Sequence, residues 1–128
     1  MNATAGHLGK IAQIAVSSHD VAKAVPFYRD VLGLKLMFEV SGMAFFDAGG
    51  TRLMIGPAHV KGELQNNTYI YFDAGDWQAT EAALIARGLK FEREAEILQR
   101  AEGKEHALRF FKDPDGNALA IMGWRPAS

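Results

Sequence analysis

The chain has 128 residues, of which 48% are hydrophobic and 23% are charged, and its formal net charge is −1. This length and balance suit one globular domain with a real core, and the scattered lysines and arginines form no basic patch for nucleic acid or an anionic membrane. No apolar run approaches the ~20 residues of a membrane helix, and residues 1–9 carry no signal pattern. The absence of cysteine excludes disulfides and thiolate chemistry. We therefore expect a cytoplasmic protein.

The first elements in chain order are a strand and a helix. Residues 11–17 predict a strand, and Asp20 precedes a helical segment that runs to about residue 32. The Asp20 carboxylate can accept hydrogen bonds from the free N–H groups of the first helical turn. Gly33 suits the left-handed conformation that often ends a helix. Because Pro26 lacks an N–H donor, we expect a kink or a tight first turn within this helix.

Two further strands close the first half. Residues 45–46 and 53–55 are apolar and flank a Gly49-Gly50 pair, a pattern typical of two strands joined by a turn. The following segment, approximately residues 57–66, carries proline, glycine and polar residues. We interpret it as a linker.

The second half begins as the first does. Residues 68–74 predict a strand, and Asp76 precedes a helical segment to about residue 87. The triplet Gly88-Leu89-Lys90 then follows. It repeats the triplet Gly33-Leu34-Lys35 at the corresponding place in the first half.

The end of the second half completes an internal repeat. Residues 110–111 and 119–121 predict a strand pair around an Asp-Pro-Asp-Gly turn. We interpret Gly116 and the residue after it, Asn117, as part of this turn rather than of a phosphate or calcium loop. Four matched landmarks in one order predict a duplication. The single domain, residues 1–128, would contain two βαβββ modules, at approximately 9–56 and 67–125.

Two segments resemble the signatures of a known superfamily. Residues 11–20 with 27–34, which end in Phe-Tyr-Arg-Asp-Val-Leu-Gly-Leu, resemble the opening of vicinal oxygen chelate proteins, which include glyoxalases, bleomycin-resistance proteins and extradiol dioxygenases. Residues 110–117, Phe-Phe-Lys-Asp-Pro-Asp-Gly-Asn, resemble their closing signature. The resemblance implies an α+β fold in which the two βαβββ modules form a curled mixed sheet, or cup, with the helices outside. It names no substrate.

Enzymes of this superfamily hold a divalent metal in the cup through four side chains, usually His or Gln, Glu, His and Glu. The matching positions in this chain are Gln13, Met54, Tyr69 and Ala120. A glutamine carbonyl can coordinate a hard cation, whereas a thioether or a neutral phenol is a poor donor and a methyl group is none. The resemblance therefore implies that the metal site is lost, and we expect neither a metal nor a cofactor.

Strand alternation assigns residues to the predicted cup. The cup-facing set suits a mostly apolar ligand pocket and comprises Gln13, Met54, Tyr69, Tyr71, Ala120 and Met122. Arg52 has the same parity and either binds an anionic ligand group or pairs with an acid at the rim. We expect Gln13 and Tyr69 to be buried in the cup, so both need hydrogen-bond partners, which are either each other or a ligand. The two methionines and Trp124 are either plain packing or an adaptable binding surface. The alternation leaves open which Phe of each Phe-Phe pair faces the cup.

Other candidates are histidines and charged residues. His7 lies in the terminus, His19 before a helix, and His59 in the linker, whereas His106 begins a late strand and either borders the cup or lies at an edge. No histidine belongs to a recognisable metal-binding motif.

Near His106 lie Glu102, Glu105 and Arg109. A carboxylate at the rim of the cup could act as a base. The segment from Glu102 to Glu105 is more typical of a solvated hairpin.

Three functional interpretations follow. The first is a metal-free binder of a small, partly aromatic or apolar organic molecule, as in the bleomycin-resistance branch that the chain resembles. The alternative is a glyoxalase-like lyase, isomerase or dioxygenase-type enzyme with a degenerate or relocated site. The third is a dimerisation module, because members of the superfamily often pair and the linker would permit two copies to exchange halves. We expect a small organic ligand and a homodimer, and no nucleic acid or membrane as partner.

Overall fold

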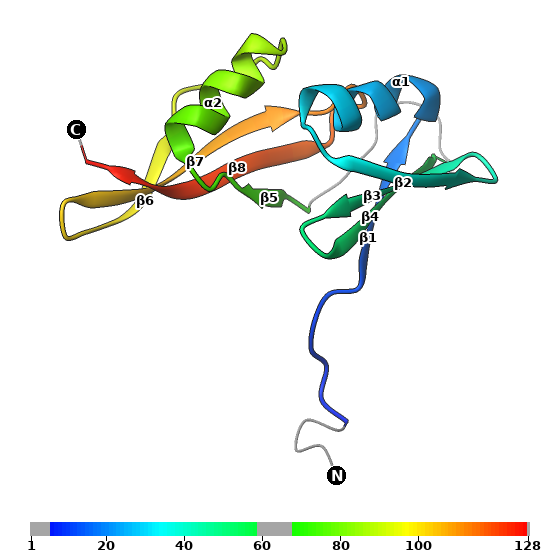
Figure 1. Cartoon of the computed structure of the whole chain (residues 1–128), viewed down its shortest axis with the longest axis horizontal. Helices are drawn as coiled ribbons and strands as arrows, with labels where there is room; N and C mark the ends of the chain where they lie inside the picture. The colour runs from blue at the N-terminus through cyan, green and yellow to red at the C-terminus, as the bar shows by residue number, and fades with distance from the viewer. Residues whose placement is uncertain (1–5, 59–67, 128) are drawn as a thin grey trace.

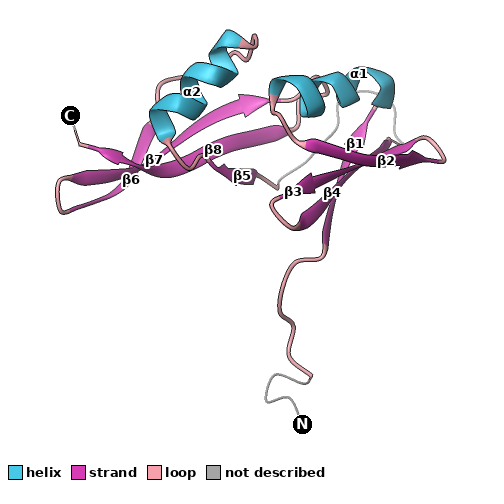
Figure 2. Ribbon diagram, viewed as in Figure 1, coloured by secondary structure: helices cyan, strands magenta, loops and turns pink. Residues whose placement is uncertain are grey.

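A computed structural model describes residues 6–58 and 68–127, which form two four-stranded sheets with helices on one side (Figures 1 and 2). The elements of the first module are β1 (Gln13–Ser18), α1 (Val21–Pro26), η1 (Phe27–Val31), β2 (Lys35–Val40), β3 (Met43–Ala48) and β4 (Thr51–Pro57). Those of the second are β5 (Ile70–Asp73), α2 (Trp77–Ala86), β6 (Glu96–Ala101), β7 (Lys104–Lys112) and β8 (Ala118–Pro126).

The two sheets have the same topology. Their strand orders are β1-β4-β3-β2 and β5-β8-β7-β6. In each sheet the first and last strands of the module pair in parallel and the other pairs are antiparallel. The predicted α+β fold of two βαβββ modules is therefore confirmed. The linker predicted at 57–66 lies, beyond residue 58, outside the described residues.

Both helices begin and end where their caps predict. The side chains of Asp20 and Asp76 accept hydrogen bonds from the backbone N–H three residues further on, over 3.3 and 3.0 Å. Gly33 and Gly88 follow the helical segments with φ values of +78° and +99°, a region that favours glycine. Within the described ranges, neither helix is long and apolar enough to cross a membrane.

The first helix changes character at Pro26. The α-helical segment ends there, and the chain continues through the wider π-helical turn η1, in which the Leu32 N–H donates to the Phe27 carbonyl over 2.9 Å. Proline has no N–H to donate to the carbonyl four residues earlier, and its ring crowds that carbonyl. The predicted irregularity at Pro26 is confirmed, and it takes the form of a wider turn.

The hydrophobic core fills the space between the helices and the sheets and continues across both modules. Its fully or nearly fully buried members include Val16, Tyr28, Phe46, Leu53, Ile55, Trp77, Leu84, Phe111, Leu119 and Ile121. The face assignment from strand alternation is therefore confirmed. Phe46 and Phe111 are 0% exposed in this core, whereas Phe45 and Phe110 lie on the other face of their sheets. We call that other face, turned away from the helices, the open face.

A buried polar network ties the two modules together. The Tyr28 hydroxyl of η1 donates to Oδ2 of Asp113 over 2.6 Å, and the Asn117 amide donates to the same oxygen over 2.8 Å. The Asn117 amide also donates to the Ser17 carbonyl of β1 over 2.9 Å. Burial and the adjacent Asp113 carboxylate raise the pKa of Tyr28 well above its usual range. The Asp-Pro-Asp-Gly-Asn segment is thus a structural turn, as predicted.

Candidate functional site

On the first sheet, the open face presents an arginine held by neutral groups. The parallel pairing of β1 with β4 sets Gln13 opposite Arg52, and the Arg52 Nε–H donates to Gln13 Oε1 over 2.7 Å. The guanidinium carbon lies 5.1 Å from the centre of the Phe45 ring, within cation–π range. The Phe45 ring stacks on Phe38 with centres 4.6 Å apart. The Gln13 amide and the Phe45 ring therefore hold Arg52 without neutralising its charge.

On the second sheet, the open face presents an aromatic cluster. The rings of Tyr69 and Tyr71 meet the Phe110 ring edge-on, with centres 5.6 and 6.0 Å apart. Phe110 also packs with Ala120 and Met122 in a small cluster separate from the main core. Tyr69 and Tyr71 remain 51% and 44% exposed. Aromatic surface is therefore available to a ligand or a partner on this face.

His106 lies at a hollow beside this cluster. β7 and β8 pair His106 with Trp124, and their rings stack with centres 4.7 Å apart. These two residues line a hollow of about 550 Å³ together with Tyr71 and Met122. Of the two alternatives for His106, the structure favours a position at the border of the open face.

The predicted site residues fall on two separate sheets. Gln13, Arg52 and Met54 belong to the first sheet. The second carries Tyr71, His106, Ala120 and Met122, and Tyr69 directly precedes its strand β5. Across this division, Arg52 and Tyr71 line a common hollow of about 180 Å³.

Two expectations about the polar groups are wrong for the single chain. Gln13 and Tyr69 are exposed rather than buried. Gln13 is paired with Arg52 rather than with Tyr69. Arg52, in turn, is held by an amide and not by an acid at the rim.

The four positions that match the superfamily's metal ligands do not fit a metal. Gln13 Oε1 already accepts a hydrogen bond from Arg52, whose positive charge disfavours a cation at that oxygen. The Met54 sulfur, 4.0 Å from Gln13 Nε2, is a soft thioether. Tyr69 directly precedes β5 of the other sheet, and Ala120, on β8 of that sheet, has no donor atom. In residues 6–58 and 68–127, no group of three or more His, Cys, Asp or Glu could hold a metal ion.

The charged residues near His106 are structural, which corrects the expectation of a solvated hairpin at Glu105. Glu102 lies in the exposed turn, but the Glu105 side chain is only 4% exposed. Glu105 accepts a hydrogen bond from Arg125 Nε over 2.8 Å, because β7 and β8 place these residues opposite each other. Arg109 pairs with Glu81 of α2, also over 2.8 Å. Glu105 and Arg109 therefore face the helices rather than the open face.

The other histidines lie outside this region. His7 and His19 are exposed in loops. The backbone N–H of His19 donates to Asp115 Oδ1 over 2.8 Å, which adds to the contacts between the modules. His59 lies outside the described residues.

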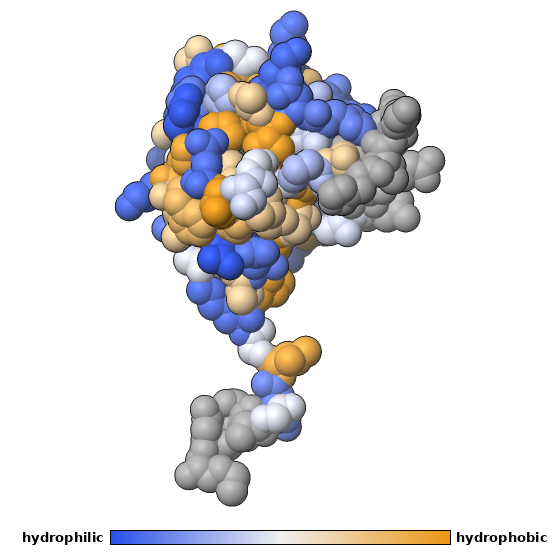
Figure 3. All heavy atoms as spheres, turned by 90° about the vertical axis from the view of Figure 1, so that its right-hand side faces the viewer, coloured by the Kyte–Doolittle hydropathy of each residue, from blue (hydrophilic) through white to orange (hydrophobic). Residues whose placement is uncertain are grey.

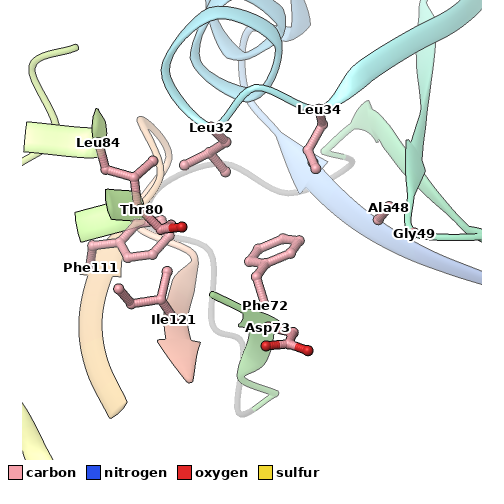
Figure 4. A pocket seen from close by; sticks show the side chains of 10 residues that line it. All are labelled: Leu32, Leu34, Ala48, Gly49, Phe72, Asp73, Thr80, Leu84, Phe111 and Ile121. Atoms are coloured by element: carbon pink, nitrogen blue, oxygen red, sulfur yellow. The ribbon is translucent and has the colours of Figure 1, made fainter. Parts of the chain in front are cut away.

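A further hollow lies on the helix side. Its volume is about 450 Å³, and Figure 4 shows its walls, which are formed by Leu32, Leu34, Ala48, Gly49, Phe72, Asp73, Thr80, Leu84, Phe111 and Ile121. Its two polar side chains are engaged locally: Thr80 Oγ1 donates to the Ala74 carbonyl over 2.6 Å, and Asp73 Oδ1 accepts from the Gly75 N–H over 2.9 Å. This hollow is a seam in the packing between the modules rather than a site with convergent polar groups.

Sequence reasoning missed part of the open face. Phe38 was not assigned, because no strand was placed over β2. Simple alternation would also fail there, since the pairing of β2 with β3 shifts register between Leu36 and Phe38. Phe45 and Phe110 were each left undecided within a Phe-Phe pair. Both members of each pair are the same residue type, so the sequence gives no reason to prefer one. The strand register decides, because Phe45 pairs with Met54 and Phe110 pairs with Ala120, and paired residues share a face.

Comparison with known proteins identifies the family. A sequence profile of the Glyoxalase/Bleomycin resistance protein/Dioxygenase superfamily matches residues 10–121, so the chain belongs to this superfamily. It is 30% identical over 128 residues to the uncharacterized protein YraH of Bacillus subtilis, with 88% of this chain and 96% of YraH covered. It is 29% identical over 119 residues to the metallothiol transferase FosB of Staphylococcus epidermidis, with 87% of this chain and 81% of FosB covered.

Solved structures agree in fold. Lactoylglutathione lyase from Agrobacterium tumefaciens matches with a TM-score of 0.72 at 19% identity, over 91% of this chain and 94% of the lyase. A glyoxalase/bleomycin resistance protein/dioxygenase from Alicyclobacillus acidocaldarius also gives 0.72 at 19% identity, over 90% and 91%. At these identities the likeness concerns the fold alone.

Proposed function

We propose that this chain binds a small, partly aromatic or apolar organic molecule against its open face, without a family-type metal. The supporting observation is the aromatic surface left on that face, where Tyr69, Tyr71 and Trp124 are 51%, 44% and 41% exposed. Exposed aromatic groups gathered on one face are typical of binding surfaces, whereas singly scattered ones are not. Gln13 and Arg52 supply the few polar groups that orient a ligand in such a site.

We propose further that a second copy of the chain completes the pocket as a homodimer. On β2, Met37, Phe38 and Val40 are 48%, 44% and 49% exposed, and Figure 3, which views the molecule from the end where β2 lies, shows hydrophobic surface among hydrophilic residues. Covering such surface releases the water that it orders. Light scattering on the purified chain is expected to give twice the mass of one chain. A monomer at all accessible concentrations would contradict the dimer.

The binding proposal is tested with a library of neutral aromatic fragments in the presence of a chelator. We expect fragments to raise the melting temperature of the wild type and to lose this effect in the Tyr69→Ala/Tyr71→Ala double variant. The matched control is Ile85→Ala, because Ile85 is also 51% exposed but lies on α2. If the double variant and the control respond alike, the site is not on the open face.

A metal-dependent enzyme is the second candidate, because several relatives are named metallothiol transferases. Activity of that kind needs a metal to polarise the substrate, and the donor set of Gln13, Met54, Tyr69 and Ala120 argues against it. Adding Ni²⁺, Zn²⁺ or Mn²⁺ separates the two candidates. A binder keeps its ligand affinity with and without metal, whereas the enzyme would need the metal for turnover.

A further inference from the structure

We propose that Arg52 is an anion anchor and that the ligand class is a small aromatic carboxylate. This inference rests on the proposed function, since it specifies the molecule that the open face receives. It also selects between the two roles that the sequence leaves open for Arg52, which are binding an anionic ligand group and pairing with an acid at the rim. Three properties of Arg52 support it: an uncompensated charge, a fixed orientation, and an aromatic neighbour across the division between the sheets.

The charge of Arg52 is uncompensated. Arginine side chains of this protein mostly pair with acids, and a carboxylate oxygen lies 2.8–3.6 Å from Arg29, Arg93, Arg100, Arg109 and Arg125. Within the described ranges, Arg52 and Arg87 have no such ion pair. Arg87 lies at the end of α2, where its Nε–H donates to the Ala83 carbonyl. The register of β3 and β4 sets Asp47 opposite Arg52, but this carboxylate accepts from the Gly50 N–H over 2.8 Å and makes no ion pair with Arg52. Arg52 therefore has terminal nitrogens available on the open face, where it favours a negatively charged ligand group.

The orientation of Arg52 is fixed in advance. Its Nε–H is held by Gln13 Oε1 over 2.7 Å, and its plane is packed near the Phe45 ring. In the part of the chain that the structure describes, its two terminal nitrogens make no hydrogen bond. A guanidinium offers parallel N–H donors that match the two oxygens of a carboxylate. Because Gln13 and Phe45 already restrict the side chain, less conformational entropy is lost when the anion binds.

The aromatic part of the ligand follows from Tyr71. Arg52 and Tyr71 line the same hollow of about 180 Å³, whose other walls are largely aliphatic, including Ile11 and Ile14. Tyr71 is 44% exposed and belongs to the aromatic cluster of the second sheet. A carboxylate attached directly to an aromatic ring can therefore contact Arg52 with its oxygens and Tyr71 with its ring. An ammonium group in the same place would be repelled by Arg52.

The test compares two ligands of nearly equal shape, 2-naphthoate and its neutral amide, 2-naphthamide, titrated by NMR at low salt. We expect the wild type to bind the carboxylate about tenfold more tightly than the amide, since a bidentate charge-assisted contact replaces a neutral one. Arg52→Gln should bring the affinities of the two probes together, because the carboxylate then loses more binding than the amide. Arg52→Lys keeps the positive charge but loses the pair of parallel N–H donors, so we expect an intermediate preference for the carboxylate. Arg87→Gln removes the same charge from the helix side and should change nothing.

Each alternative result has a distinct meaning. Equal binding of the two probes, both lost in the Tyr69→Ala/Tyr71→Ala variant, would overturn the anion anchor and leave the proposed function standing. An equal loss of preference in Arg52→Gln and Arg87→Gln would show that only net charge matters, which also overturns the anchor. If neither probe binds at millimolar concentration, the anchor is overturned, and the neutral fragment library alone decides the proposed function.

Discussion

Removal of the Tyr28 hydroxyl is expected to loosen the junction between the modules. The hydroxyl is buried and donates over 2.6 Å to the Asp113 carboxylate, which keeps three other donors, from the backbone of Asp115 and from the backbone and side chain of Asn117. A hydrogen bond to a charged group contributes about 2 kcal/mol. Tyr28→Phe retains the ring packing, so we expect this loss alone, or a melting temperature lower by about 8 °C for a domain of this size.

Thermal and urea unfolding, followed by circular dichroism, measure this loss. The control is Tyr71→Phe, because the Tyr71 hydroxyl makes no hydrogen bond within the described residues and its side chain is 44% exposed. The control should change the unfolding free energy by less than about 0.5 kcal/mol. Equal effects of the two substitutions would refute the structural role of the buried network.

The pH dependence gives a second readout of the same group. The raised pKa of Tyr28 means that the folded protein keeps its phenol proton while the unfolded chain ionises near pH ~10. The stabilisation is therefore complete below that pH and is lost as the pH rises, by up to about 1.4 kcal/mol per pH unit. The stability advantage of the wild type over Tyr28→Phe should shrink between about pH 9 and pH 11. A constant difference would contradict the buried, protonated phenol.

Three further predictions concern the fold and the metal. Glu105→Gln should lower the unfolding free energy, measured with urea, by about 1–3 kcal/mol, because it weakens the buried pair with Arg125. The control Glu102→Gln, in the exposed turn, should change it by less than about 0.5 kcal/mol. Gly33→Ala should cost about 1 kcal/mol, because its φ of +78° strains a residue with a side chain; an unchanged urea midpoint would contradict this. Elemental analysis after growth with Ni, Zn, Mn and Fe should find less than about a tenth of an equivalent of metal, and near one equivalent would mean that the donor set at Gln13 has been misjudged.

The internal repeat and the resemblance to a known superfamily were sufficient to predict the fold, and the alternation of strand residues predicted its two faces. Apolar residues such as Leu53 and Ile121 alternate with mixed ones, and the burial of the helix side follows from that pattern. Gly33 and Gly88 helped to predict the duplication. Each marks the end of a helix with a backbone conformation that few residues other than glycine adopt.

Long-range pairing was beyond this reasoning. The contact between Gln13 and Arg52 depends on the parallel register of β1 and β4, which are separated by a helix and two strands. The burial of Glu105 likewise depends on Arg125, 20 residues away. Alternation also cannot distinguish a residue in a closed cup from one on an open sheet, and for this reason Gln13 and Tyr69 were expected to be buried.

The central claim, metal-independent binding on the open face, is tested most directly by chemical-shift mapping of the isotope-labelled protein with 2-naphthoate in the presence of EDTA. The account predicts saturable shifts at residues of the open face, above all Arg52, Tyr71 and Phe110, with no change on the helix side at Thr80 or Leu84. Shifts confined to the helix side, or binding that appears only after a divalent metal replaces the EDTA, would contradict it.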